Sequence, residues 1–165
     1  MKSVSAIDKK IFTLSQLMAQ VASWRITHKK IAFTNGCFDI FHEGHIFSLT
    51  QAAKEADYLI VGVNSDRSTK KLKGPERPVN TEQSRALLLA NLLIVDATII
   101  FDEDTPLELI KAILPDVLVK GGDYTLQQIV GSAEVIANGG RVVINPIVAG
   151  FSSSKIIDQI KASFS

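Results

Sequence analysis

Residues 29–45 read KKIAFTNGCFDIFHEGH, and this stretch decides how the whole chain is interpreted. A short apolar run leads into a turn that contains Gly36, and Asp39, His42 and His45 follow. The chain has three histidines in all, so two of them placed three positions apart just beyond an apolar run indicate a site. If that run is a strand of a parallel sheet, the turn lies at its carboxyl end, where such sheets bind ligands.

Short apolar runs and amphipathic segments alternate along the rest of the chain. The pattern predicts strands over residues 30–34, 58–64, 97–101, 116–120 and 141–146, and helices over residues 13–25, 45–56, 80–92, 105–114, 132–138 and 152–164. We expect Asn80 or Thr81 to cap the third helix, Thr105 to cap the fourth, and Pro106 to be the first residue of the fourth. The helix predicted over residues 45–56 should bury Ile46, Leu49 and Ala53. Residues 65–79 are polar and basic and predict a loop.

Apolar strands that lack alternation and are separated by helices predict a parallel sheet covered on both faces. We therefore expect an α/β fold, with a Rossmann-like, doubly wound sheet of five parallel strands. The whole of residues 1–165 should form a single domain, with an N-terminal helix at about 13–25 and a core at about 30–160. Three polar segments, residues 34–45, 64–74 and 120–124, follow strands and should converge at the carboxyl edge of the sheet.

Composition excludes several classes of protein. Eighteen basic and 17 acidic residues leave a formal charge of +1, which does not suit a nucleic-acid binder that depends on bulk electrostatics. The single cysteine, Cys37, excludes an intrachain disulfide framework and a cysteine-rich zinc site. The first residues lack the apolar core of a signal peptide, and no segment is apolar enough to cross a bilayer. We expect a cytoplasmic protein with no nucleic-acid or membrane partner.

Three hypotheses account for the histidine pair. A shared helical face would let His42 and His45 bind a metal, although a zinc site made of protein side chains needs a third ligand. The pair could instead cap a helix or satisfy a loop. The third hypothesis is phosphate binding, because Gly36 and Gly44 allow close approach and a helix that begins at about His45 presents free N–H groups to an anion.

The sequence also resembles a known family. FTNGCFDIFHEGH, residues 33–45, resembles the G-x-F-D-x-x-H-x-G-H signature of the cytidylyltransferase-like nucleotidyltransferases. GFSSSKII, residues 150–157, resembles their second signature, with Phe151 in place of isoleucine and serines in place of threonines. Segments between the two signatures are similar to the adenylyltransferases of ADP-heptose synthesis. The resemblance covers roughly residues 13–160.

This resemblance implies the H-x-G-H nucleotidyltransferase fold and a transfer of AMP. ATP would react with D-glycero-β-D-manno-heptose 1-phosphate to give ADP-heptose and pyrophosphate, a precursor for lipopolysaccharide or another heptose-containing glycan. The implied cofactor is Mg²⁺, held by the phosphates of ATP rather than by protein side chains. The implied partners are ATP, a sugar phosphate and a second copy of the chain in a homodimer.

The resemblance also implies roles for individual residues. The catalytic residues would be His42, His45 and Lys73. Backbone or side-chain groups would bind the nucleotide at Asn35, Gly36, Cys37, Phe38, His42, His45, Gly121, Gly122, Asp123, Ser152, Ser153 and Ser154. Weaker substrate-binding candidates are Asp39, Asn64, Arg85 and Lys155. Structural alternatives stay open for several of them: helix capping for the serines, a solvated loop for Lys73 and a surface ion pair for Arg85.

Three other functions stay open on the sequence. The first is a cytidylyltransferase that acts on glycerol 3-phosphate or a related alcohol phosphate, which would share both signatures. The second is an adenylyltransferase for a different sugar 1-phosphate. The third is a non-catalytic nucleotide-binding module, which would bind ATP without releasing pyrophosphate.

Overall fold

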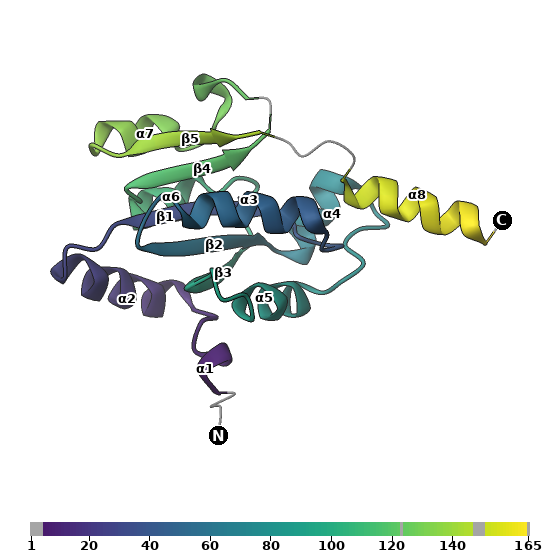
Figure 1. The fold of residues 1–165 in the computed structure, drawn as a ribbon, viewed down its shortest axis with the longest axis horizontal. Coiled ribbons are helices and arrows are strands. Elements are labelled where there is room, and N and C mark those ends of the chain that lie inside the picture. Colours follow the sequence, from purple (N-terminus) through teal and green to yellow (C-terminus); the bar gives the residue numbers. More distant parts are fainter. Residues whose placement is uncertain (1–4, 123, 147–150, 165) are drawn as a thin grey trace.

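A sheet of five parallel strands forms the centre of the computed structural model, which describes residues 5–122, 124–146 and 151–164 (Figure 1). The strands are β1 (Ile31–Gly36), β2 (Tyr58–Asn64), β3 (Ala97–Phe101), β4 (Val117–Gly121) and β5 (Arg141–Asn145). Their order in the sheet is β3-β2-β1-β4-β5, and every pairing is parallel. The predicted α/β fold and the five predicted strands are confirmed, with boundaries that differ by at most two residues.

The chain reverses its direction of winding at β1. From β1 it proceeds to β2 and β3 on one side, and it then returns to place β4 and β5 on the other side. Phe33 on β1 is in register with Ile60 of β2 and with Leu118 of β4. The carboxyl ends of β1 and β4 therefore flank the switch point, which is where ligands bind in open α/β sheets.

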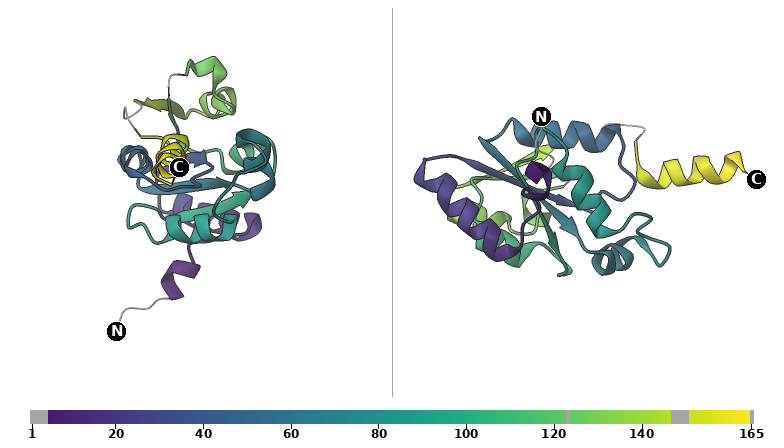
Figure 2. Two further views of the ribbon diagram at one scale, coloured as in Figure 1. Left: turned by 90° about the vertical axis from the view of Figure 1, so that its right-hand side faces the viewer. Right: turned by 90° about the horizontal axis from the view of Figure 1, so that it is seen from below.

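Helices and one 3₁₀ turn connect the strands. They are α1 (Ser5–Asp8), α2 (Leu14–Ile26), α3 (Glu43–Ala53), α4 (Asp66–Lys73), α5 (Glu82–Ala90), α6 (Leu107–Ile113), η1 (Leu126–Gln128), α7 (Ser132–Ala137) and α8 (Ser153–Ser163). α8 extends away from the sheet in two different views (Figures 1 and 2). None of the helices in the described part of the chain has the length and apolarity needed to cross a membrane.

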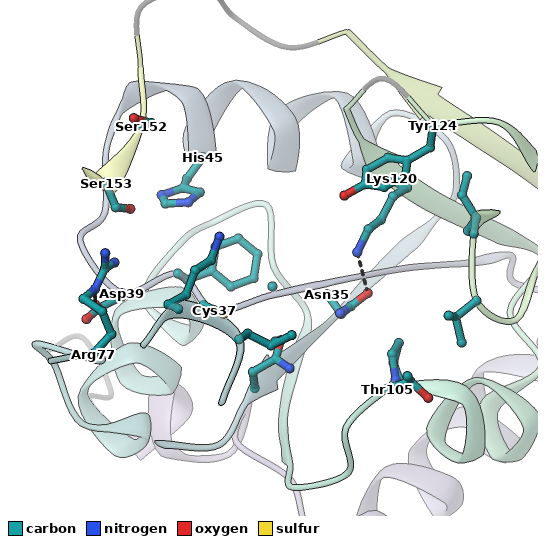
Figure 3. A pocket seen from close by; sticks show the side chains of 18 of the residues that line it. Asn35, Cys37, Asp39, His45, Arg77, Thr105, Lys120, Tyr124, Ser152 and Ser153 are labelled. Carbon is teal, nitrogen blue, oxygen red and sulfur yellow. Dashed lines mark hydrogen bonds and ion pairs between the residues drawn. The ribbon is translucent and has the colours of Figure 1, made fainter. Parts of the chain in front are cut away.

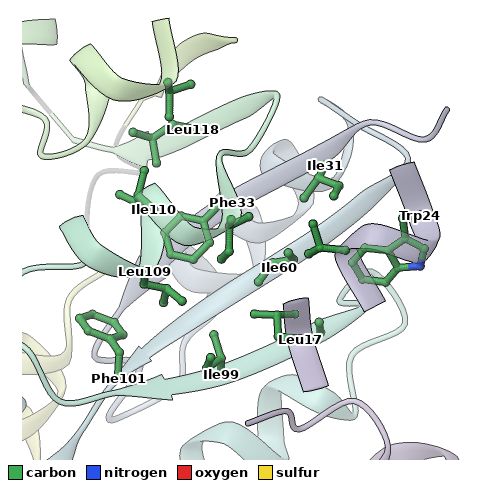
Figure 4. Close-up of a cluster of buried hydrophobic side chains, with 14 of the residues drawn as sticks. Leu17, Trp24, Ile31, Phe33, Ile60, Ile99, Phe101, Leu109, Ile110 and Leu118 are labelled. Carbon is green, nitrogen blue, oxygen red and sulfur yellow. The ribbon is translucent and has the colours of Figure 1, made fainter. Parts of the chain in front are cut away.

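Each face of the sheet carries its own apolar core. On one face, α2 and α6 pack against strand residues such as Phe33 and Ile60 (Figure 4). Trp24 of α2 stacks on Tyr58 with ring centroids 4.3 Å apart, which closes the edge of this core. On the other face, α3 and α5 cover a second cluster that includes Val61. Both faces are buried, which explains why the strands show no polar alternation.

Several helix boundaries differ from the sequence prediction. α6 begins at Leu107, and Pro106 occupies the capping position with no side-chain cap from Thr105. α5 begins after Thr81, whose hydroxyl accepts a hydrogen bond from the Ser84 N–H, so that predicted cap is confirmed.

The second predicted helix also starts earlier than expected. α3 begins at Glu43 rather than at about His45. Leu49 and Ala52 are its buried residues, whereas Ile46 is 47% exposed. The prediction that Ile46 faces the core was wrong, because the inward face passes through Leu49 and Ala52 instead.

The segment predicted to be a loop contains a helix. α4 covers residues 66–73, and the Ser65 hydroxyl caps it by accepting from the Ser68 N–H at 3.0 Å. Its exposed surface is polar and basic, so no apolar stripe signals it in the sequence. Arg67 and Lys71 instead form ion pairs with Asp102 and Asp104 beyond β3, contacts that only the folded chain creates.

Candidate functional site

A cavity of about 600 Å³ opens at the carboxyl edge of the sheet, where the ends of β1, β2 and β4 meet. Residues from six separate stretches of sequence line it (Figure 3): Asn35–Asp39 with His42 and His45, Asn64, Leu72–Arg77, Asp104–Pro106, Leu118–Val130 and Phe151–Ser154. The three segments predicted to converge at this edge therefore do meet.

The turn after β1 is tightly closed. Phe38 has a positive φ of 48°, and its ring folds back over Gly36. A Cβ at Gly36 would lie only 3.1 Å from the Phe38 ring, closer than most contacts allow, so glycine suits this position. The turn carries Asn35 and Cys37 into the cavity lining and delivers the chain to the start of α3.

The two histidines stand at the N-terminus of α3. His42 is the capping residue and has extended backbone angles, but its side chain makes no capping hydrogen bond. The His42 and His45 rings stack with centroids 3.8 Å apart and planes 21° apart. Neither Nδ1 atom has a hydrogen-bond partner among the described residues, although both are buried. Both imidazoles line the cavity, so these unsatisfied atoms are suited to a polar ligand.

The histidines are neutral at neutral pH. Burial lowers the pKa of His45 to about 4, and electrostatic coupling to His42 and Lys73 adds to that effect, because a proton on His45 would be repelled by charge on either neighbour. Burial also lowers the pKa of His42. A neutral imidazole presents one donor and one acceptor, so each ring can donate a hydrogen bond without being charged.

The C-terminal serine run reaches the same helix start. A Cβ on Gly44 would lie 3.1 Å from the His42 ring and 3.1 Å from the Cβ of Phe151, so glycine permits two segments that are distant in sequence to meet here. Ser152 caps α8 by accepting from the Lys155 N–H, and Ser153 donates to the Ile40 carbonyl at 3.3 Å.

All three serines line the cavity near the histidines, with Ser152 and Ser153 beside His45 in Figure 3. Lys155 is exposed and does not line the cavity. Gly150, which begins the second signature, lies outside the described residues.

Asp39 ties the first signature to the loop that follows α4. Its carboxylate accepts from Arg77 at 2.5 Å and from the backbone N–H groups of Val79 and Asn80, each at 2.8 Å. Burial alone would raise the pKa of Asp39, but the two N–H donors and the arginine outweigh it, so the pKa is lowered. Asp39 is 3% exposed, and its bonds hold Arg77 at the cavity wall.

Arg85 lies beneath the cavity rather than in its lining. It is 1% exposed, and its guanidinium donates to the carbonyls of Cys37 at 2.5 Å and Asn80 at 3.0 Å. A third bond, at 2.7 Å, joins it to Asp66. The structure thus makes Arg85 neither a surface ion-pair partner nor a cavity residue, and it supports the β1 turn from behind.

Lys73 and Asn64 both line the cavity. Lys73 is exposed in the last turn of α4, and it is close enough to His45 to lower that histidine's pKa. Asn64 is buried at the end of β2 and donates to the Ser68 hydroxyl at 3.0 Å. Lys73 thus belongs to α4, and Asn64 contacts the same helix through Ser68.

The end of β4 differs from expectation. Gly121 and Gly122 are not among the residues that line the cavity, and Gly122 has a positive φ of 133°. Asp123 lies outside the described residues. Within the predicted segment 120–124, Lys120 and Tyr124 line the cavity, although the sequence analysis did not select either one as a site residue.

Other lining residues were missed as well: Leu72, Arg77, Asp104, Thr105, Gln128 and Val130. Lys120 is the first polar residue after the apolar run of β4, and that position was the only feature of the sequence that could have identified it as a cavity residue.

The carboxylates described at the cavity do not form a metal site. Asp39 faces Arg77, and Asp104 faces Lys71. No group of three or more His, Cys, Asp or Glu side chains with metal-binding geometry occurs within residues 5–122, 124–146 and 151–164.

Comparisons with known proteins agree with this geometry. The profile of a family described as cytidylyltransferase-like matches residues 33–159. The bifunctional protein HldE of Koribacter versatilis is 52% identical over 158 residues, which cover 96% of this chain and 32% of that protein. HldE of Hyphomonas neptunium is 55% identical over 147 residues, 89% of this chain and 30% of that protein. The chain spans about a third of the length of these curated relatives.

Solved structures also match. A lipopolysaccharide core biosynthesis protein from Thermoplasma volcanium is 28% identical with a TM-score of 0.58, covering 73% of this chain and 97% of that one. A pantoate-β-alanine ligase from Francisella tularensis has a TM-score of 0.60 at 16% identity, covering 92% of this chain and 76% of that one. The second likeness concerns the fold alone.

Proposed function

The chain belongs to the cytidylyltransferase-like family, as its two signatures predicted, and on that premise we propose that it is the adenylyltransferase of ADP-heptose formation. In this reaction AMP passes from ATP to D-glycero-β-D-manno-heptose 1-phosphate, and pyrophosphate leaves. The observation that carries the proposal is the meeting of His42, His45, Lys73 and the serine run at one cavity. The identity of about half to HldE proteins supports the assignment to the adenylyltransferases, and the acceptor is the one that the sequence resemblance implies.

The reaction requires alignment and charge neutralisation. A phosphate oxygen of the sugar attacks the α-phosphorus of ATP, and the bond from that phosphorus to the oxygen bridging to the β-phosphate breaks. The attacking oxygen is already anionic, so no strong base is needed. The barrier comes from repulsion between two anions, and groups that hold both in line and donate hydrogen bonds to them lower it.

The start of α3 suits the nucleotide phosphates. Its first N–H groups lack partners within the helix and carry the positive end of the helix dipole. The unsatisfied imidazole nitrogens of His42 and His45 add donors beside it. An anion at this point raises the pKa of a histidine, so nucleotide binding also favours proton uptake by the pair. Lys73 and the serine hydroxyls complete this side of the cavity.

When Mg²⁺ is bound with ATP, it neutralises part of the phosphate charge. The chain's own residues then have two tasks: to fix the orientation of the α-phosphate and to stabilise the pyrophosphate as it departs. The histidine pair suits the first task, and Lys73, at the end of α4, suits the second.

The proposal includes a homodimer. None of the described α8 residues is buried in the single chain. Ile160 on this helix is 52% exposed, and Phe164, which follows its last residue, is 89% exposed. A second copy could cover this apolar surface. Light scattering after size-exclusion chromatography tests this, and a monomer at micromolar concentration would contradict it.

The decisive experiment is a pyrophosphate-release assay with Mg²⁺ that crosses ATP and CTP with the heptose 1-phosphate and glycerol 3-phosphate. We expect release with ATP and the heptose phosphate alone. Release with CTP and glycerol 3-phosphate would show the cytidylyltransferase alternative to be correct. ATP binding without release in any combination would favour a nucleotide-binding module.

A further inference from the structure

Lys120 is a cationic side chain of the cavity that the roles above leave unused. It is the penultimate residue of β4, next to β1 at the switch point of the sheet. In Figure 3 it enters the cavity beside Tyr124, on the side opposite His45 and the serines. Its ammonium donates to the Asn35 side-chain oxygen at 3.4 Å, a long bond that leaves donor capacity for a ligand.

The surroundings of Lys120 make its charge costly in the absence of a ligand. Burial lowers the pKa of this lysine, and the nearby Cys37 only partly opposes that effect. Leu118 and Ile129 form apolar parts of the same wall. No carboxylate within the described residues forms an ion pair with Lys120. A half-buried ammonium without a counter-charge is stabilised strongly by an incoming anion.

The other two cationic side chains of the described cavity lining, Arg77 and Lys73, have identifiable neighbours. Arg77 is neutralised by Asp39. Lys73 lies close enough to His45 to affect its pKa, so it belongs to the histidine side. Lys120 is thus the one lysine or arginine of the described lining that lies away from the histidines and is unpaired. The reaction brings two anions together, the nucleotide and the acceptor phosphate. The two lysines that lack an ion-pair partner among the described residues, Lys73 and Lys120, lie in different parts of the cavity, so each can bind one of these anions.

We propose that Lys120 binds the phosphate of the acceptor, a sugar 1-phosphate, while the histidine side binds the nucleotide. This role rests on the adenylyltransferase function proposed above. Around Lys120, the side chains of Asn35, Thr105, Tyr124 and Gln128 offer hydroxyl and amide groups, which match the hydroxyls of a sugar. The lysine thereby fixes the attacking phosphate near the α-phosphate without needing to remove a proton.

The test compares Lys120→Met and Lys120→Arg with the wild type in steady-state kinetics. Methionine keeps the length of the side chain and removes the charge, and it should not unfold the protein because the wall is partly apolar. We expect the KM for the heptose phosphate to rise at least tenfold in Lys120→Met, the KM for ATP to stay within twofold, and Lys120→Arg to recover part of the loss. Lys111→Met, at an exposed position on α6, is the matched control and should behave as wild type.

Binding without turnover separates this inference from the proposed function. Isothermal titration of the heptose 1-phosphate, with no nucleotide, is run on the wild type and Lys120→Met. Binding that Lys120→Met loses supports the acceptor site, even if ATP proves to be the wrong nucleotide.

Three results would overturn the inference. They are equal binding by the two proteins, no binding by the wild type, or a rise confined to the KM for ATP. An active wild type with unchanged acceptor KM in Lys120→Met would overturn it while leaving the adenylyltransferase function intact.

Discussion

The imidazole rings of His42 and His45 stack with centroids 3.8 Å apart, and the Nδ1 atoms of both lack partners among the described residues. At this distance a proton on one ring opposes a proton on the other, and His42 contributes to the low pKa of His45. The pair is therefore arranged to receive an anion and to gain charge only when one is present. A structural role would instead give each buried nitrogen a protein partner.

Replacement of His45 should separate catalysis from folding. In His45→Ala the donor to the phosphates is lost, and we expect kcat to fall by about 10²- to 10³-fold, the effect of removing one transition-state donor. His45→Gln keeps an amide donor and should retain more activity than the alanine variant. Thermal unfolding serves as the control, because it shows whether His45→Ala stays folded at the assay temperature despite the lost ring contacts. Near-normal turnover in His45→Ala would show that the histidine is not catalytic.

The histidine pair should also make the fold sensitive to mild acid. The pKa of His45 is about 4 in the folded chain and about 6.5 when unfolded, so the unfolded state binds more protons between these values. Stability is therefore complete above pH 6.5 and declines as the pH falls toward about 4. Urea unfolding at pH 7.5 and pH 5 measures this decline. His45→Gln, which cannot titrate, should show a smaller decline in the free energy of unfolding. An equal decline in this variant would mean that other groups cause the loss of stability in acid.

Gly44→Ala tests the contact between the two signatures. The added Cβ would lie 3.1 Å from both the His42 ring and Phe151, so one of them must move by a few tenths of an ångström. We expect the fold to survive and kcat/KM to fall about tenfold or more, since small displacements of catalytic groups are costly. Circular dichroism confirms folding. Ser48→Ala, farther along α3, is the control substitution and should leave kcat/KM close to wild type.

Asp39 and Arg77 should act as a coupled unit in stability. Asp39→Asn leaves a buried arginine without its charge partner and weakens two backbone bonds, so we expect a loss of about 2–4 kcal/mol. In a double-mutant cycle with Arg77→Met, the double variant should lose less than the sum of the two single losses. Additive losses in urea unfolding would mean that the ion pair does not hold the loop to the first signature.

The sheet could be predicted from sequence because its strands are buried on both faces and appear as uninterrupted apolar runs. The predicted site residues at the β1 turn and the serine run belong to two short signatures, and these lie side by side in the fold. α4 was missed because it has no apolar stripe, and its ion pairs from Arg67 and Lys71 join it to residues beyond β3. Local sequence contains no signal for such contacts.

Arg77 and Lys120 were missed for a similar reason. A basic residue in a loop or at a strand end is commonly only solvated, and what distinguishes these two is their tertiary surroundings. Arg77 is fixed by Asp39, which is 38 positions away in the chain. Lys120 is half-buried because the carboxyl ends of β1 and β4 are adjacent. Gly121 and Gly122, although next to Lys120, are not among the residues that line the cavity, a difference that depends on the folded structure.

Arg85 offers the last prediction, since it joins the site to the core without touching the cavity. Its guanidinium reaches Cys37, Asn80 and Asp66 at once, which a lysine cannot do with a single ammonium. Arg85→Met leaves two carbonyls without their donor and should destabilise the fold by about 3 kcal/mol. Arg85→Lys should lose less stability, yet still reduce turnover, because the carbonyl of Cys37 would no longer be fixed. Unfolding experiments and steady-state kinetics on both variants test this prediction. Unchanged turnover in a folded Arg85→Lys protein would mean that the β1 turn keeps its conformation without the bond from Arg85 to the Cys37 carbonyl.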